Sequence, residues 1–303
     1  MTEYLGRGDA RRSMALLWGT GEPPKRGPKQ GLSVEAIVTA AIELADADGL
    51  DALSMRKVGE RLGTSAMALY TYIPAKTELI DVMVDTVLGE LPVAYPLDDG
   101  WRAAAEACAQ AGWELYERHP WILQIAGARA SLGPHELASY EAQLGIFLDI
   151  GLRAFEVSRV VGSISSYVRG AAKAVADARA AEKATGMTDD EWWYSRSALL
   201  EEMADFDWEE TLPATSRLAA EHVFEQPHRA VDDATPYMER EALDDFAFGL
   251  ARLLDGVEAL IERRRREEQP PEATTKKATT KKATTKKATT KKATKAASRS
   301  RSA

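Results

Sequence analysis

The chain has 303 residues, of which 45% are hydrophobic and 28% charged, as in an ordinary globular protein. Its one cysteine, Cys108, excludes a disulfide framework and a multi-cysteine zinc site, and we expect it to be a small core residue. No run of 18 apolar residues occurs, so we expect no membrane span and a cytoplasmic protein. The net charge of −8 hides an uneven distribution, because residues 273–303 contain nine Lys, two Arg and no acid, which leaves −19 for the rest.

The first 32 residues have the composition of an arm. Glycines and prolines over residues 19–31 interrupt any helix, although residues 11–18 fit a short one. Three basic residues make the arm positive: Lys25, Arg26 and Lys29. They suit either entry into a minor groove or a solvated linker. We predict a flexible basic arm over residues 1–32.

Residues 33–92 form the next unit and show four apolar repeats of helical spacing. Ser33 is placed to cap the first helix, and Gly49 ends it. Two short helices follow over residues 54–62 and 65–72, and a fourth precedes the next prolines. This arrangement predicts a small all-helical domain.

A Pro- and Gly-containing break at residues 92–100 separates this unit from a larger helical domain, which we place at residues 100–268. One of its helices is expected over residues 121–130. No segment alternates like a strand, so the predicted fold class is all-α. Residues 269–303 are mostly an Ala-Thr-Thr-Lys-Lys repeat, too poor in apolar surface to order, and we predict a disordered tail. This tail is either a solubilising extension or a DNA-binding arm, and its charge favours the arm.

Residues 54–72 have the pattern of a helix-turn-helix. Gly63 suits the sharp turn, where a positive φ is needed. The second helix presents small, nearly uncharged side chains that fit a major groove. Basic residues on the flanks, Arg56, Lys57 and Lys76, are placed to hold phosphates, which sets register rather than sequence preference.

The run from Val34 to Leu91 resembles the DNA-binding domain of the TetR (tetracycline repressor) family of transcriptional regulators. The pieces that carry this resemblance are Ile37–Ala41, Leu44–Ala45, Gly49, Leu53–Arg56, Val58–Gly59, Leu62–Gly63, Leu69–Tyr72 and Lys76–Leu79. Further pieces resemble the ligand-binding domain of the tetracycline-repressor subgroup, namely His119–Trp121, Leu132–Pro134, Tyr140–Glu141, Tyr167–Gly170 and Phe246–Leu250. The resemblance covers residues 33–265. It implies an all-α homodimer, with a seam at residues 155–181 and 239–266, that binds a palindromic operator and is released by a small ligand.

The resemblance also implies site residues in the first domain. Phosphate contacts fall on Arg56, Tyr70, Lys76 and Met55, the last by its backbone or not at all. Base-reading positions fall on Ala66, Met67, Ala68 and Thr71, and Ser65 and Tyr72 complete the outward face. Ala66 replaces the amide side chain with which tetracycline repressors read a base, so we expect a different operator.

Aromatic residues are numerous for an Ala-rich helical domain and make an apolar ligand cavity plausible. The candidates are Trp101, Trp113, Tyr116, His119, Trp121, Phe147 and Tyr167. Each alone also fits a core position, and His119 fits a structural role in its turn. The segment 192–194, Trp-Trp-Tyr, is a pocket lid, a partner contact or helix packing. Tetracycline repressors bind a metal–drug complex through a His at the position of residues 125–127, where this chain has none, so no metal or cofactor is expected.

An enzyme is the competing class of protein, but the chain shows no Ser-His-Asp context, no phosphate-binding Gly loop and no His/Cys cluster. The sequence therefore predicts a ligand-responsive regulator, expected to be a repressor, with an operator, a small apolar or aromatic effector and a second copy of the chain as partners. The alternative is a nucleoid-associated architectural protein dominated by its Lys-rich tail.

Overall fold

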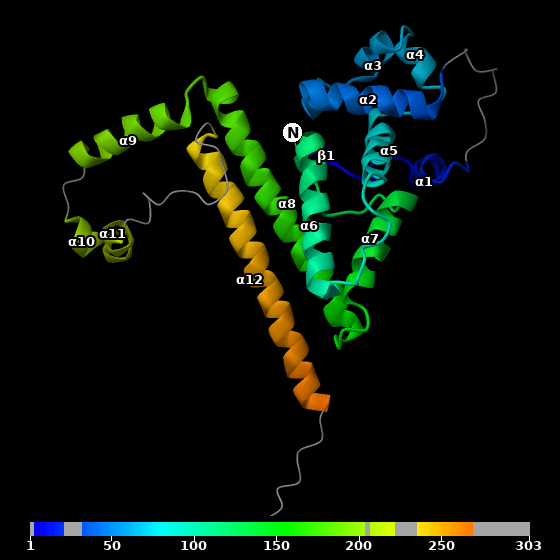
Figure 1. Ribbon diagram of the computed structural model, residues 1–303. Helices are drawn as coiled ribbons and strands as arrows, with labels where there is room; N and C mark the ends of the chain where they lie inside the picture. Colours follow the sequence, from blue (N-terminus) through cyan, green and yellow to red (C-terminus); the bar gives the residue numbers. More distant parts are fainter. Residues whose placement is uncertain (1–2, 21–31, 204–206, 222–234, 269–303) are drawn as a thin grey trace, which may run out of the picture. The chain divides into compact units, whose positions relative to one another are not determined.

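The structure, a computed structural model, describes residues 3–20, 32–203, 207–221 and 235–268. Within these ranges the predicted all-α class is confirmed (Figure 1). The α-helices are α1 (Ala10–Leu17), α2 (Val34–Asp48), α3 (Met55–Arg61), α4 (Ala66–Leu69), α5 (Lys76–Leu88), α6 (Gly100–Arg118), α7 (Pro134–Phe147), α8 (Ala154–Thr185), α9 (Asp189–Met203), α10 (Trp208–Thr211), α11 (Pro213–Ala220) and α12 (Tyr237–Glu268). The remaining elements are two 3-10 helices, η1 (Leu50–Ala52) and η2 (Pro120–Gln124), and two short strands, β1 (Glu3–Tyr4) and β2 (Ile125–Ala126).

The first hydrophobic cluster forms where α2 crosses α5 (Figure 1). The Ser33 hydroxyl caps α2 by accepting from the Ala36 N–H at 3.1 Å, as its position in the sequence predicted. The apolar stripes of the two helices then face each other, and their side chains at Ile37 and Leu79 are fully buried. Each such burial contributes roughly 1.5–3 kcal/mol, which holds the short helices α3 and α4 on a firm base.

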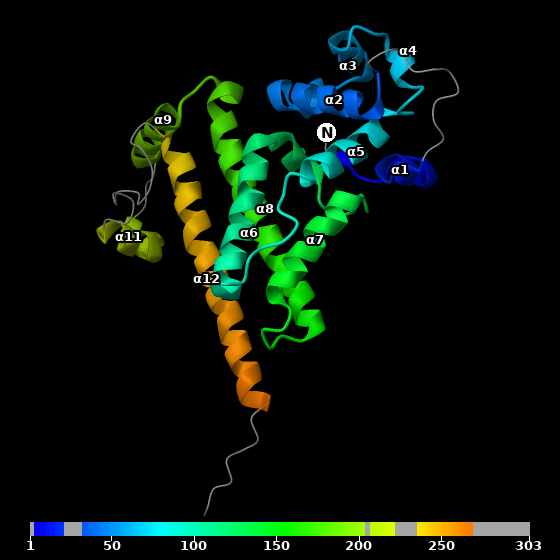
Figure 2. The same ribbon diagram turned by 45° about the vertical axis from the view of Figure 1, so that its right-hand side comes forward.

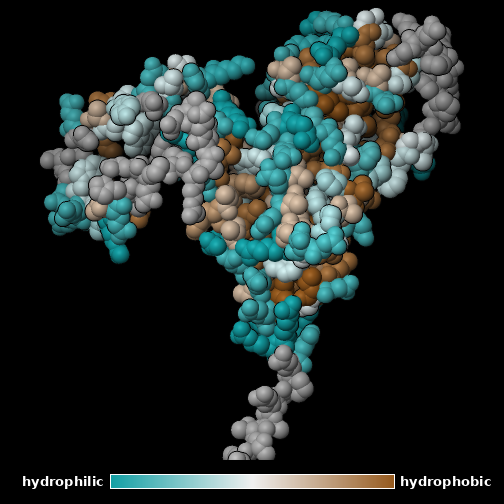
Figure 3. All heavy atoms as spheres, in the orientation of Figure 1, coloured by the Kyte–Doolittle hydropathy of each residue, from teal (hydrophilic) through white to brown (hydrophobic). Residues whose placement is uncertain are grey.

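A second cluster joins α6, α7, α8 and α12. Figures 1 and 2 show α6, α8 and α12 running side by side. Trp113 of α6 stacks on Phe246 of α12 with ring centroids 4.3 Å apart, and the Arg102 guanidinium donates to Asp255 at 2.8 Å. Figure 3 shows hydrophobic side chains that remain at the surface between α12 and α6.

The prediction of a helix over residues 121–130 is wrong. This stretch forms η2 and β2 instead, because the Arg169 guanidinium of α8 donates to carbonyls that a helix would use internally. Its bond to the Ile122 oxygen is 3.1 Å long, and the Ile125 oxygen also accepts from it. A charged side chain thus holds a 3-10 helix followed by a short strand where the apolar pattern suggested one α-helix.

The flexible arm predicted for residues 1–32 is not what the structure shows for residues 3–20. There β1 pairs in parallel with β2, and α1 packs on α5, because apolar side chains at both ends of the segment are buried. The basic residues at 25, 26 and 29 and the Lys-rich tail lie outside the described residues.

Residue contacts group Met1–Glu267 into one unit, so the domain division at residues 92–100 stays a prediction. No helix in the described part of the chain is long and apolar enough to cross a membrane.

Candidate DNA interface and effector cavity

The turn between α3 and α4 is tight because two glycines permit it. Gly63 has φ +62°, the left-handed conformation expected from its place in the motif. A Cβ atom added at Gly59 would lie 2.9 Å from the Thr64 carbonyl oxygen. The Thr64 N–H in turn donates to the Gly59 oxygen at 2.8 Å. Only a glycine at position 59 lets the turn pass this close, so α4 is held against α3.

The helical phase of α4 decides which predicted base-reading side chains reach solvent. Met67 is 74% exposed, while Leu69, two positions on, is completely buried. The other exposed side chains of this segment are those of Ser65, Tyr70 and Thr71. Three other predicted contacts, Ala66, Ala68 and Tyr72, are half-buried and pack on the first hydrophobic cluster. The exposed face is uncharged.

Cationic side chains flank this face. Arg56 on α3 is exposed and pairs with Glu60 one turn later at 2.6 Å. An exposed pair of this spacing is worth only about 0.3–0.5 kcal/mol, so the guanidinium can exchange it for a phosphate. Lys76 is the first residue of α5. The Met55 side chain is buried, which leaves its backbone as the only group that could reach DNA.

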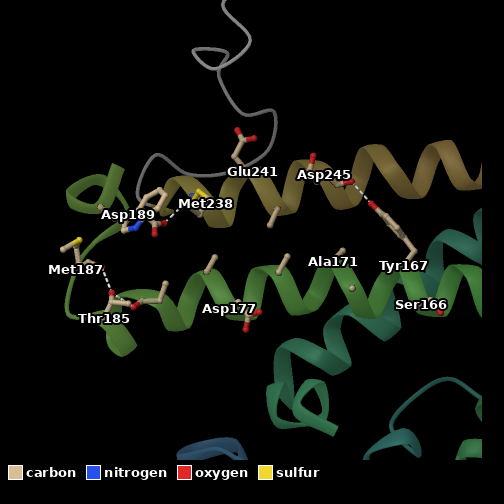
Figure 4. A pocket seen from close by; sticks show the side chains of 16 residues that line it. Ser166, Tyr167, Ala171, Asp177, Thr185, Met187, Asp189, Met238, Glu241 and Asp245 are labelled. Atoms are coloured by element: carbon tan, nitrogen blue, oxygen red, sulfur yellow. Dashed lines mark hydrogen bonds between the residues drawn. The ribbon is translucent and has the colours of Figure 1, made fainter. Parts of the chain in front are cut away.

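A cavity of about 850 Å³ lies between α8 and α12 and is closed at one end by the start of α9 (Figure 4). Its floor is a stripe of small residues on α8, Ala171, Ala174, Ala178 and Ala181. The Tyr167 hydroxyl bridges the two helices by donating to the backbone oxygens of Asp245 at 2.6 Å and Phe246 at 3.0 Å. Gly249 makes room for it, since a Cβ there would lie 2.2 Å from the Tyr167 hydroxyl.

Each ionisable side chain that lines this cavity, apart from Tyr167, is a carboxylate: Asp177, Asp189, Glu241 and Asp245. In Figure 4 the side chains of Asp177 and Glu241 point away from the gap between the helices. The cavity therefore has an apolar floor and an acidic rim.

A second cavity of about 820 Å³ lies between the end of α2, α6, η2 and the end of α8. A third, of about 260 Å³, lies under β1 beside residues 125–130. Its wall includes Leu5, Tyr116 and Arg169.

Two parts of the chain match known protein families. Residues 37–83 match the family described as "Bacterial regulatory proteins, tetR family", and residues 91–261 match "Tetracyclin repressor-like, C-terminal domain". The chain is 39% identical over 272 residues to the HTH-type transcriptional repressor DrrR1 of Streptomyces coeruleorubidus, covering 89% of this chain and 93% of that one. It belongs to the TetR family of transcriptional regulators.

Other members of the TetR family agree with this assignment. The HTH-type transcriptional repressor Rv1353c of Mycobacterium tuberculosis is 27% identical over 250 residues, covering 80% of this chain and 87% of that one. The crystal structure of SCO7222, a TetR from Streptomyces coelicolor, is 26% identical, with a TM-score of 0.55, covering 76% of this chain and 99% of that one. The ActR–actinorhodin complex from the same organism has the same fold, with a TM-score of 0.58 at 23% identity over 78% of this chain and 99% of that one. These relatives are named as regulators or repressors of transcription.

The predicted ligand residues of this TetR-family regulator do not converge on one site. Tyr167 lines the cavity between α8 and α12, whereas Trp113, Tyr116 and Trp121 line the second. Trp101 and Phe147 contact each other with ring centroids 6.1 Å apart and line neither cavity.

His119 lines neither of these two cavities. It is buried, and its ring nitrogens contact two carboxylates, Asp46 at 2.8 Å from Nδ1 and Glu90 at 3.1 Å from Nε2. The Trp121 indole N–H also donates to Asp46, at 2.7 Å. These contacts tie α2 to η2. They fit a structural role for His119 in its turn.

The sequence did not predict the α12 side of the cavity between α8 and α12, including Met238 and Ala242. One signal was available, because alanines at 171, 174, 178 and 181 recur at spacings of 3 and 4 and so share a face of α8. Trp192 lines the cavity, whereas Trp193 and Tyr194 are exposed. In the described part of the chain, no group of three or more His, Cys, Asp and Glu side chains is arranged to hold a metal ion.

Proposed function

We propose that this TetR-family regulator is a repressor that binds a palindromic operator as a homodimer and leaves it when a small effector occupies the cavity between α8 and α12. The observation that carries the proposal is the uncharged exposed face of α4 between Arg56 and Lys76. A face of this kind reads bases by apolar contact, with Met67 and the Thr71 methyl against thymine methyl groups, while the cations hold phosphates.

The dimer seam is proposed on α8 and α12, which are the longest described helices at 32 residues each. Both expose large apolar side chains, with Phe155 of α8 61% and Phe248 of α12 66% accessible in the single chain. Exposed apolar surface of this kind marks interaction sites. A two-fold axis through this seam would repeat the reading face for two operator half-sites about one helical turn apart.

The effector is proposed to be an apolar or aromatic molecule without negative charge. The alanine floor and Tyr167 offer apolar and aromatic contact, and the carboxylates of the rim repel anions. ActR, which has the same fold, forms a complex with actinorhodin, so this fold accommodates a small molecule. The operator is released if the effector binds a conformation in which the two DNA-binding domains of the dimer no longer match the successive major grooves of the DNA.

The decisive experiment is selection of bound DNA from a random pool, followed by titration of the selected operator. We expect one palindromic sequence. Arg56→Ala and Lys76→Ala should weaken binding to every sequence five- to tenfold, whereas substitutions of Thr71 should change the preferred base. Arg217→Ala removes the same charge from an exposed residue on α11 and is the matched control. A pool that converges on no shared sequence contradicts the proposal.

The effector site has its own test. Ala178→Trp places an indole in the cavity between α8 and α12, and any compound that releases the wild type from its operator should fail on this variant. Ala107→Trp, at an exposed position of α6, is the control and should release normally. If the compound releases both variants from the operator equally, the effector binds outside this cavity.

An architectural DNA-binding role is the second candidate, because residues 273–303 carry eleven cations and no acid. Neutralising about six phosphates makes affinity fall roughly 10³-fold or more between 50 and 200 mM salt. Deletion of residues 273–303 should flatten this salt dependence and leave operator preference intact. If unrelated DNA competes as well as the operator does, the architectural role replaces the repressor.

A further inference from the structure

Residues 3–18 form a segment that we call the N-terminal strap. It precedes the helix-turn-helix in sequence but contacts elements on both sides of the predicted domain boundary. Figures 1 and 2 both show α1 beside α5. At one end of the strap, Tyr4 is paired with Ala126 in the β1–β2 ladder. At the other end, the Trp18 indole N–H donates to the Leu132 carbonyl at 3.1 Å.

Carboxylates on α5 anchor the strap. Asp81 is 2% exposed and accepts from the Gly6 N–H at 3.0 Å and from the Ser13 hydroxyl at 3.2 Å. Glu78, also buried, accepts from the Asp9 N–H at 3.3 Å. Buried carboxylates of this kind are costly unless they are hydrogen-bonded, and the strap supplies the donors. The anchors lie within two turns of Lys76, the proposed phosphate contact at the start of α5.

The strap also covers the third cavity. Leu5 is 5% exposed and lines this space together with Ala126 and with Val84 of α5. Arg169 holds the facing backbone through the carbonyls of residues 122, 123 and 125. Anything that enlarges the contents of the cavity therefore presses on β2, on the strap paired with it, and on α5 directly.

We propose that the N-terminal strap transmits the state of the 125–130 segment to α5 and so to the DNA-reading head. It rests on the proposed function in one respect, namely that α5 carries a DNA contact. When the cavity is filled, β1 moves with β2, the bonds that Gly6, Asp9 and Ser13 of the strap donate to the α5 carboxylates break, and α5 loses the support that positions Lys76. The strap is thus a coupling element between the larger domain and the operator.

A double-mutant cycle tests this coupling without any effector. Ala126→Phe fills the cavity. Gly8→Ala loosens the strap by displacing the Glu78 carboxylate from the Asp9 N–H, since a Cβ at Gly8 would lie 2.5 Å from the Glu78 carboxylate oxygen. In the otherwise wild-type chain, we expect Ala126→Phe to weaken binding to the selected operator at least fivefold. Combined with Gly8→Ala, the same substitution should change affinity less than twofold. An equal effect in both backgrounds, or no effect in either, overturns the proposal.

Hydrogen exchange of the free protein gives a readout that does not need an operator. Ala126→Phe should speed exchange of the α5 amides at residues 76–82 at least threefold, and this acceleration should be absent in the Gly8→Ala background. Ser13→Ala, which removes one donor to Asp81, is a second way to loosen the strap. Arg11→Ala, at an exposed position of α1, is the matched control. Failure to select an operator refutes the proposed function alone, whereas unchanged α5 exchange in Ala126→Phe refutes the strap.

Discussion

Gly59→Ala is the sharpest test of how the reading head is built. The added Cβ would lie 2.9 Å from the Thr64 carbonyl oxygen, 3.1 Å from the Ala66 nitrogen and 3.2 Å from the Ser65 carbonyl carbon. All three are backbone atoms, so none can rotate away and the turn must open. Overpacking of this kind costs about 1–3 kcal/mol, against about 1 kcal/mol that alanine gains over glycine in a helix. Because the neighbours are rigid, we expect a net loss of about 1–2 kcal/mol.

The stability is lost in the α3–α4 unit, which presents the exposed side chains of α4. We expect operator affinity to drop about tenfold, which corresponds to about 1.4 kcal/mol, and the urea midpoint to fall. Gly145→Ala in α7 is the matched control, since nothing lies within 4 Å of its added Cβ. It should raise stability by about 0.5–1 kcal/mol and leave affinity unchanged. Wild-type operator affinity in Gly59→Ala would refute the argument that this close approach positions α4.

Three further predictions concern the larger half of the chain. The Arg264 guanidinium lowers the pKa of the Glu156 carboxyl from its ordinary 4.5, so the pair stabilises the fold above that pH and loses its effect as pH falls through the lowered pKa. Urea unfolding should therefore show Glu156→Gln less stable than the wild type at pH 7 and the difference shrinking at pH 3. Burial raises the pKa of the Cys108 thiol, so a disulfide reagent at pH 8 should react with it at least tenfold more slowly in buffer than in urea. Tyr167→Phe removes a hydroxyl donor to two α12 carbonyls and should cost about 1 kcal/mol of stability, measured by urea unfolding.

The helix-turn-helix and the helices that support it, residues 33–92, are the part of the fold that the sequence predicted best. Its signals are local, because a cap at Ser33, a glycine at the turn and apolar positions at helical spacing each act within a few residues. The structure places these features where the pattern put them, including the positive φ of Gly63. The exposure of single side chains on α4 was predicted less well. Its helix is only four residues long, so the apolar pattern is too short to define a face.

The sequence predicts the helices of the larger half of the chain but not the position of its cavity. Aromatic residues are the predicted cavity candidates, yet Phe147 is buried in the core and Tyr167 alone of the seven candidates lines the cavity between α8 and α12. Large aromatic side chains bury well wherever space allows, so their presence does not locate a cavity. The space between α8 and α12 arises instead where side chains are small, and the alanine spacing on α8 is what reports it.

The contacts that join the two halves left little trace in the sequence for a physical reason. Glu78, Asp81 and Asp85 lie on one face of α5 at spacings of 3 and 4, a pattern typical of a solvated face. All three are less than 5% exposed. Besides the side chains of Ser13 and His135, their partners are backbone N–H groups far along the chain, from Gly6 to Asp81 and from Glu136 to Asp85, the latter at 2.9 Å.

A backbone N–H group can donate whatever the side chain of its residue, so no sequence motif predicts such a bond. Gly133 gives the nearest hint, because a Cβ there would overlap the Asp85 carboxylate. Burying three carboxylates on one helix is tolerable only while those donors are in place. Whatever moves the strap or the start of α7 therefore leaves a buried charge on α5 unpaired. On the proposed coupling, the larger half of the chain therefore acts on DNA through α5 rather than through α4.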